Sequence, residues 1–128
     1  MKNQTTRYSS ANGEVWAMAT FKVKYCKKVF NIPSVRKECS KFLIEALNYN
    51  KIKFGNIGFD EDHVHILLDM GLLSKPEIAK RLKGSVGRKI LTNLKWLKQK
   101  MFWGSGFWSP SYDVRSHEFD VLSRYIDK

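Results

Sequence analysis

Two histidines placed two residues apart are the clearest candidates for chemistry in this sequence. His63 and His65 stand in the stretch 60–69, and the apolar run that follows them predicts a strand entering a buried sheet. Successive side chains of a strand point to opposite faces, so both imidazoles project from one face and Val64 and Ile66 from the other. Two imidazoles on a rigid strand provide half of a metal site. Taken alone, the pattern is more typical of polar residues at the edge of a half-buried sheet.

The charge of the chain indicates an anionic partner. Its 128 residues contain 23 Lys and Arg against 12 Asp and Glu, a formal net charge of +11. A small domain this basic usually meets a polyanion, and nucleic acid is favoured over an anionic membrane surface. The sequence shows no apolar run of membrane-spanning length and no signal-peptide pattern at the N-terminus.

Length and composition predict one folded domain, residues 1–128, with a single sizeable core. Hydrophobic residues make up 43% of the chain and aromatic residues 13%, which argues against a disordered tail. Cys26 and Cys39 lie far from any C-x-x-C arrangement, which favours free thiols in the reducing cytoplasm.

The elements that would position the histidines follow from hydrophobic periodicity. Alternation predicts a first strand over residues 15–25, with Tyr25 the last residue of its apolar face. Pro33 and apolar residues at helical spacing predict an amphipathic helix over 34–49. A second strand is expected from about 52 to 59, with a bulge at Gly55 where the alternation changes phase. The acidic turn 60–62 then joins it to the histidine strand as an antiparallel hairpin.

The second half of the chain predicts two more helices and a strand. Ser74 and Glu77 form a capping-box signature, and apolar residues continue from there at helical spacing. A short strand is expected through Tyr112 and Val114, and a last helix over 118–128. The order strand–helix–strand–strand–helix–strand–helix predicts an α+β fold, one antiparallel sheet with helices packed against it.

Basic residues concentrate in the segment 74–100, which contains nine of them and one acid, Glu77. Interleaved with Trp96, they favour a phosphate-binding surface over a merely solvated face. The shorter cluster 24–28, which surrounds Tyr25, is as consistent with a solvated turn as with a DNA contact. The nine basic residues are Lys75, Lys80, Arg81, Lys83, Arg88, Lys89, Lys95, Lys98 and Lys100.

Chemistry at a phosphodiester would need more than the two histidines. A divalent cation acting as a Lewis acid needs a third protein ligand and open positions. A nucleophile must also reach the phosphorus, and a tyrosine on a helix is able to form a covalent intermediate. The residues alone do not single out Tyr125 among the five tyrosines, the others being Tyr8, Tyr25, Tyr49 and Tyr112.

The sequence resembles the single-tyrosine HUH transposases, small enzymes encoded by insertion sequences of the 200/605 group. The resemblance runs from about Trp16 almost to the C-terminus and rests on five motifs in order. They are Lys24-Tyr25-Cys26-Lys27-Lys28-Val29-Phe30, Asp62-His63-Val64-His65-Ile66-Leu67, Arg81-Leu82-Lys83-Gly84-Ser85, the block from Phe102-Trp103-Gly104 to Trp108-Ser109-Pro110-Ser111-Tyr112, and Tyr125-Ile126.

That resemblance implies a ferredoxin-like sheet, a C-terminal helix carrying the nucleophilic tyrosine, a homodimer, and Mg²⁺- or Mn²⁺-dependent strand transfer on single-stranded DNA, with hairpins at the element ends as the expected partner. Carried over, His63 and His65 bind the metal, which polarises the scissile phosphate. Tyr125 attacks it, forming a 5′-phosphotyrosine link and a free 3′-hydroxyl that later rejoins strands. The tyrosine helix is able to serve the histidines of the other protomer. The residues expected to contact DNA are Lys24, Lys27, Lys28, Arg81, Lys83, Arg88 and Lys89.

Two positions depart from the family pattern. Glu61 stands where the family often has Pro, with an expected effect only on turn shape and local charge. The family's third metal ligand, a Gln or Asn four residues after the tyrosine, would lie past Lys128. Glu118 lies on roughly the right helix face and is the fallback ligand, whereas His117 is more consistent with a turn residue.

Two other functions remain open at this point. One is a non-enzymatic ferredoxin-like module that binds RNA or DNA through its basic helix and aromatic residues, with incidental histidines. The other is a different HUH endonuclease, such as a replication initiator or a relative that processes genomic repeats. The short chain argues against initiators and relaxases, which carry their motifs on larger domains. Metal-dependent cleavage of single-stranded DNA separates an enzyme from a binding module.

Overall fold

A four-stranded antiparallel sheet is the frame of the protein. The computed structural model describes residues 15–102 and 106–116. Its elements are, in chain order, β1 (Trp16–Val23), the 3₁₀ turns η2 (Lys24–Cys26) and η3 (Val29–Asn31), α1 (Pro33–Tyr49), β2 (Phe54–Phe59), β3 (His63–Asp69), α2 (Lys75–Asn93), α3 (Lys95–Met101) and β4 (Trp108–Ser116).

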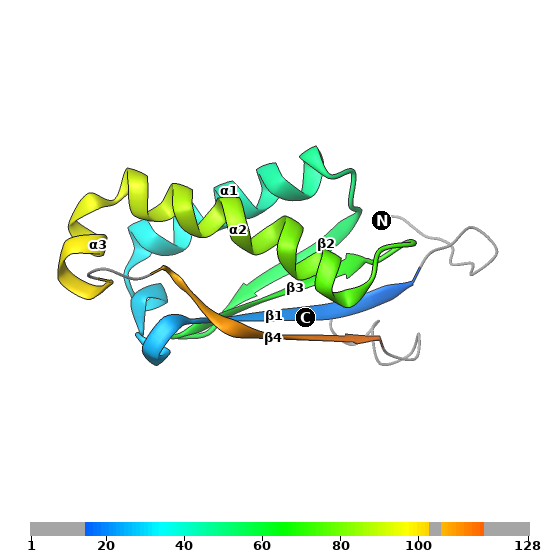
Figure 1. The fold of residues 1–128 in the computed structure, drawn as a ribbon, viewed down its shortest axis with the longest axis horizontal. Coiled ribbons are helices and arrows are strands. Elements are labelled where there is room, and N and C mark those ends of the chain that lie inside the picture. Colours follow the sequence, from blue (N-terminus) through cyan, green and yellow to red (C-terminus); the bar gives the residue numbers. More distant parts are fainter. Residues whose placement is uncertain (1–14, 103–105, 117–128) are drawn as a thin grey trace.

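The order of the strands across the sheet is β2-β3-β1-β4, and every neighbouring pair is antiparallel. Figure 1 shows α1 and α2 side by side over one face of this sheet, with α3 at one end of the helical layer. Two strand–helix–strand units interleaved in this way make the split arrangement of a ferredoxin-like α+β fold. The fold class predicted from the sequence is confirmed.

The core lies between the sheet and the two long helices. Ala17, Ala19, Phe21 and Val23 of β1 are completely buried, because they alternate along the strand and all point toward the helices. The two long helices contribute buried residues at helical spacing to this core, which confirms the predicted apolar stripes. In α1 the buried residues are Val35, Cys39, Phe42, Leu43, Ala46 and Leu47, and in α2 they are Ile78, Ala79, Leu82, Val86, Gly87, Ile90 and Leu91.

The first strand is shorter than its apolar pattern predicts. β1 ends at Val23, and Tyr25 and Cys26 adopt positive φ angles of 62° and 54° in the turn that follows. An extended strand cannot pass through that left-handed region, so Tyr25 leaves the sheet, and 68% of its surface is exposed. Its predicted place on the buried face is therefore wrong. Both cysteines are free, Cys26 exposed and Cys39 buried, as the sequence predicts.

Two local predictions are confirmed in the middle of the chain. The pairing of β2 with β3 shifts register between Phe54 and Ile57, which is the expected irregularity around Gly55. At the start of α2 the Glu77 amide donates a hydrogen bond to Ser74 Oγ at 3.3 Å, so Ser74 caps the helix.

The basic segment contains two helices rather than one. α2 ends at Asn93, and α3 follows after Leu94, whose backbone angles are not helical. The strand predicted around Tyr112 is β4, nine residues long and at an edge of the sheet, where Pro110 is tolerated. The last helix predicted over 118–128 lies outside the described residues. Among the described helices, none is both long and apolar enough to cross a membrane.

Candidate metal centre and nucleic-acid interface

β3 carries the two histidines on the face of the sheet that α1 and α2 leave uncovered. Val64 and Ile66 are completely buried on the helix side, whereas His63 and His65 are half-buried on the other side. Alternation along the strand therefore places the side chains as the sequence predicts. The centroids of the two imidazole rings are 6.1 Å apart, so both rings face the same small volume.

Backbone hydrogen bonds fix the acidic turn that leads into β3. The Asp60 amide donates to the His63 carbonyl at 2.9 Å and closes the hairpin. The Val23 amide donates to the Asp62 carbonyl at 2.8 Å, and the Phe30 amide donates to the Glu61 carbonyl at 3.0 Å. Three consecutive carboxylates are thus held on a backbone anchored to β1 and η3.

Two of these carboxylates contact His63, one on each ring nitrogen. Asp62 Oδ1 lies 2.9 Å from Nδ1, and Asp60 Oδ2 lies 2.8 Å from Nε2. The hydrogen bond from His63 lowers the pKa of the Asp62 carboxyl, and the positive charges of His63 and Lys22 act in the same direction against a smaller opposing effect of burial. A carboxylate on one imidazole nitrogen orients the ring and makes the other nitrogen a better ligand.

Asp60, His63 and His65 together offer three ligand atoms that lie within 4.8 Å of one another. Two imidazoles and one carboxylate suit a divalent transition ion such as Mn²⁺, and leave coordination positions open for a substrate oxygen. The described part of the chain therefore contains three residues that could hold a metal. The sequence pattern predicted the two histidines as metal ligands and Asp60 only as a turn residue. The position of Asp60 three residues before His63 in a tight hairpin was the signal that could have indicated a third ligand.

A glycine makes room for the second histidine. Gly58 of β2 is paired directly with His65 of β3. A Cβ atom at Gly58 would lie 2.4 Å from His65 Nε2, closer than any side chain tolerates. The ring of His65 therefore lies over the bare backbone of residue 58. The sequence analysis did not identify this glycine, because its role depends on a strand register that follows a bulge.

The basic residues predicted to contact DNA fall into different environments. Three of them form ion pairs at the surface, where such pairs contribute about 0–1 kcal/mol and exchange readily for a phosphate. Lys24 lies 5.8 Å from the centroid of the Tyr25 ring. No described residue forms a hydrogen bond or ion pair with the side chain of Lys27 or Arg88. The three ion pairs are Lys28 with Glu61 at 3.6 Å, Arg81 with Glu77 at 3.1 Å, and Lys89 with Glu45 at 3.6 Å.

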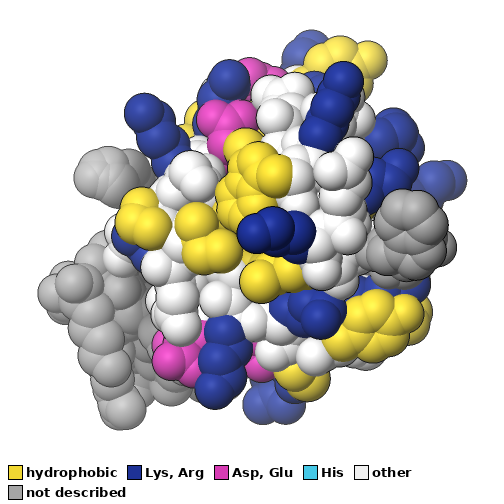
Figure 2. All heavy atoms as spheres, turned by 90° about the vertical axis from the view of Figure 1, so that its left-hand side faces the viewer, with side chains coloured by type: hydrophobic (Ala, Val, Ile, Leu, Met, Phe, Trp, Pro, Cys, Tyr) yellow, Lys and Arg dark blue, Asp and Glu magenta, His cyan; other side chains and the backbone are white. Residues whose placement is uncertain are grey.

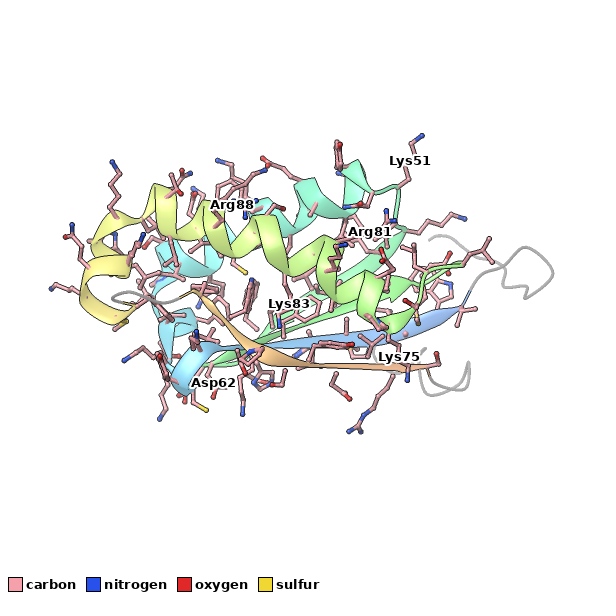
Figure 3. The ribbon with its side chains drawn as sticks, viewed as in Figure 1. Lys51, Asp62, Lys75, Arg81, Lys83 and Arg88 are labelled. Atoms are coloured by element: carbon pink, nitrogen blue, oxygen red, sulfur yellow. The ribbon has the colours of Figure 1, made fainter. Side chains whose placement is uncertain are left out.

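Lys83 holds protein groups together rather than standing in solvent. Its Nζ donates hydrogen bonds to the carbonyls of Ser109 at 2.6 Å and Ser111 at 3.1 Å, and so ties α2 to β4. Figure 3 shows its side chain pointing from α2 toward β4. Partial burial lowers its pKa from the ordinary lysine value. A DNA contact by Lys83 remains a prediction, with one ammonium hydrogen left for it.

Several predicted site residues lie outside the described residues. They include the proposed nucleophile Tyr125, the fallback ligand Glu118, and His117. The candidate metal ligands and the basic residues are therefore the parts of the predicted site whose surroundings are described.

Comparison with known proteins gives one family match across most of the chain. The family described as "Transposase IS200 like" matches residues 14–128. The ISDra2 transposase TnpA of Deinococcus radiodurans is 40% identical over 70 residues, which are 52% of this chain and 49% of that protein. The chain thus matches about half the length of this curated relative.

Two solved structures share the fold. A transposase structure from Deinococcus radiodurans superposes with a TM-score of 0.73 at 23% identity, over 99% of this chain and 96% of that chain. A REP-associated tyrosine transposase bound to a REP hairpin superposes with a TM-score of 0.54 at 12% identity, over 99% of this chain and 69% of that chain.

Proposed function

The chain belongs to the IS200-like transposase family, and from that premise we propose that it cleaves and rejoins single-stranded DNA at the ends of an insertion sequence in a metal-dependent reaction. The observation that supports this most is the cluster of Asp60, His63 and His65 on the open face of the sheet. A half-buried pair of histidines with two carboxylates is not needed to fill the core, which lies on the other face.

His63, His65 and Asp60 would hold a divalent cation, which when bound withdraws charge from an oxygen of the scissile phosphodiester. The Asp60 carboxylate and His63 Nε2 contact each other at 2.8 Å, so both atoms are close enough to serve one cation. Asp62 would keep the His63 ring in place through its contact with Nδ1 at 2.9 Å.

Asp60 is the proposed third ligand, because its carboxylate and the two imidazoles offer ligand atoms within 4.8 Å of one another. Asp60→Asn keeps the shape of the side chain and removes its charge, so we expect about a tenfold loss of Mn²⁺ affinity. Calorimetric titration of the DNA-free protein with Mn²⁺ measures it. Glu38→Gln, on α1 beside Asn93 and on the other side of the sheet, removes one surface carboxylate away from the histidines and serves as the control. Equal affinity of the Asp60 variant and the control would assign the third ligand to another residue.

The proposed nucleophile is Tyr125. Its Oη forms a bond to the phosphorus, the bond from phosphorus to the 3′ oxygen breaks, and the phenol proton passes to that oxygen. The products are a 5′-phosphotyrosine and a free 3′-hydroxyl, which reverses the step when it attacks another phosphotyrosine. Bond energy is conserved, so rejoining needs no nucleotide cofactor. Because an unperturbed phenol titrates near pH 10, a nearby cation or base must favour the phenolate.

Tyr125→Phe tests the nucleophile directly, because it removes one oxygen and keeps the ring. We expect no covalent protein–DNA adduct on a denaturing gel after incubation with single-stranded hairpin DNA and Mg²⁺ or Mn²⁺. Tyr112→Phe, an exposed tyrosine of β4, is the matched control and should form the adduct. An adduct with the Tyr125 variant would make Tyr112 the next candidate.

We also propose that the protein acts as a homodimer in which the tyrosine of one protomer serves the histidines of the other. Mixing Tyr125→Phe with a variant that carries His63→Ala and His65→Ala should then restore part of the adduct, because heterodimers contain one complete composite site. Two inactive parents that stay inactive when mixed, despite exchange of subunits, would place each tyrosine with its own histidines.

Hairpin DNA is the proposed partner, and the structural relative bound to a REP hairpin supports that choice. The net charge of +11 predicts affinity that falls steeply as salt rises. We expect tighter binding to a hairpin with single-stranded flanks than to a plain duplex of the same sequence. Equal affinity for both at moderate salt would instead favour a general nucleic-acid-binding module.

A further inference from the structure

An open groove of about 1040 Å³ lies beside α2, on the helix side of the sheet and away from the histidines. One wall is α2, one end is α3, and the other wall is the segment 106–110 at the start of β4. All the charged residues of its lining are basic, and the apolar part includes a tryptophan. The residues that matter below are Gly84, Gly87, Arg88, Leu91, Lys95, Lys98 and Trp108.

Positive charge surrounds the groove without being neutralised by the described residues. Lys95 and Lys98 project from α3, and Arg88 from α2. No described carboxylate pairs with any of these three side chains. Figure 2, which looks onto the end of the molecule that carries α3, shows Lys and Arg side chains spread over this end with hydrophobic side chains between them.

The inner wall presents an indole with an unused donor. Trp108 is only 9% exposed, and its Nε1 has no acceptor in the described part of the chain. The indole packs against Gly87, where a Cβ atom would lie 2.9 Å from Trp108 Cδ1 and 3.1 Å from Nε1. Leu91 continues this wall as an apolar surface beside the ring. The two side chains give the groove a closed apolar base, and the basic side chains stand around it.

Gly84 has no packing reason to be a glycine. Among the described residues, a Cβ atom there would meet nothing within 4 Å, in contrast to Gly87 one turn away. Glycine in the interior of a helix weakens it. The absence of a side chain at residue 84 does keep the groove open where it passes α2.

The groove and the histidines lie at the same end of β1. The Lys24 amide donates to the Phe107 carbonyl at 2.9 Å, and the preceding Val23 amide donates to the Asp62 carbonyl at 2.8 Å. The wall of the groove and the turn of the metal centre therefore bind adjacent residues of one strand end. η2, which carries Lys24, begins at this strand end.

We propose that this groove holds a stretch of single-stranded DNA, with its phosphates against Lys95, Lys98 and Arg88 and its bases in the space that Gly84 leaves open. The inference deepens the proposed function, on which it rests, by giving a path for the strand that enters the metal centre. Contacts to phosphates carry no sequence information, so the groove holds the strand without reading its sequence. A duplex has its bases paired inward and cannot place one in that space.

Binding of an unstructured labelled oligothymidylate, measured by fluorescence anisotropy with EDTA present at several salt concentrations, tests the groove without cleavage or hairpin recognition. Lys95→Ala with Lys98→Ala should weaken binding on the order of tenfold and reduce the slope of log affinity against log salt by about 1.4, since each phosphate contact on a single strand contributes about 0.7. Lys51→Ala with Lys53→Ala, in the connection between α1 and β2, removes the same charge at the far end of the molecule, where Figure 3 shows Lys51, and should change affinity less than twofold.

An uncharged substitution that blocks the groove distinguishes binding in the groove from general electrostatic attraction of DNA to the basic surface. Gly84→Leu fills the open space without changing charge and should weaken binding at least about fivefold, whereas Gly84→Ala should bind as the unchanged protein does. Both substitutions favour the helix, and thermal melting confirms that both proteins fold. Wild-type affinity of the Gly84→Leu variant, or equal losses in the two lysine pairs, would overturn the inference.

The same proteins distinguish this inference from the proposed function. If the unchanged protein forms a covalent adduct with hairpin DNA while the groove variants bind oligothymidylate normally, the proposed role of the groove is wrong and the proposed function is supported. If the groove variants lose affinity for oligothymidylate while the unchanged protein forms no adduct with any metal ion, the proposed role of the groove is supported and the proposed function is wrong.

Discussion

On β3, the residues that face the helices and the two histidines differ in what they tolerate. Toward the helices, Val64, Ile66 and Leu68 are completely buried and fill space. On the other face, His63 and His65 keep part of their surface exposed and make contacts at defined atoms, with His63 placed between two carboxylates. A core position tolerates any apolar residue of suitable volume, at a cost in free energy. A ligand position tolerates no replacement, because it depends on one atom in one place. Substitutions on the two faces should therefore fail in different assays.

The largest effect is expected on the open face. His63→Ala with His65→Ala should reduce adduct formation on the order of 10³-fold, because a bound cation contributes several kcal/mol to stabilising charge in the transition state. DNA affinity should remain close to that of the unchanged protein, since it comes mainly from Lys and Arg. Adduct yield on denaturing gels and anisotropy with hairpin DNA measure the two. Undiminished metal-dependent adduct formation would remove the histidines from the site.

Ile66→Ala changes a core residue next to His65, and should affect stability rather than metal binding. Ile66 is completely buried in the core, so its truncation should lower the free energy of unfolding by about 2–5 kcal/mol. Urea denaturation followed by circular dichroism measures this. Mn²⁺ affinity under conditions where the variant is folded should stay within about twofold of the unchanged protein. A loss of metal affinity without a loss of stability would show that the two faces are not separate.

Gly58→Ala sharpens the comparison, because it touches the ligand without being one. The added methyl group would lie 2.4 Å from His65 Nε2, so the ring must move. We expect a loss of Mn²⁺ affinity of about 10- to 100-fold, the range found for groups that orient metal ligands. Gly55→Ala, on the same strand, would meet only Leu67 at 3.3 Å and is the matched control. Similar affinities of the two variants would mean that His65 does not need its position over residue 58.

Much of the helix-side face could be predicted from the sequence, because burial follows periodicity. The alternation in β1, the stripe of α1 and the Ser74 cap are all patterns within a few neighbouring residues. The position of Tyr25 was predicted wrongly, because an aromatic residue in phase with the strand alternation does not reveal the positive φ angle at which the strand ends. The roles of Asp60 and Gly58 depend on the register that follows the irregularity in β2, and the groove depends on how α2 crosses β4. Such long-range geometry leaves no local pattern.

The smallest expected effect concerns Asp62, which orients His63 from the side away from the proposed ion. Its hydrogen bond with His63 lowers its pKa in the folded state below the unfolded value of about 3.9. A carboxyl with a lowered folded pKa adds stability above the unfolded pKa, and that stability is lost as the pH falls through the folded pKa. The unchanged protein should therefore be slightly more stable than Asp62→Asn at pH 6. The difference in stability should shrink below about pH 4, as the Asp62 carboxyl becomes protonated first in the unfolded and then in the folded state. Urea denaturation of both proteins from pH 6 to pH 3 measures it. A difference that stays constant over this range would show that Asp62 supports the turn by shape alone, and that the charge facing His63 does not contribute to holding the ring.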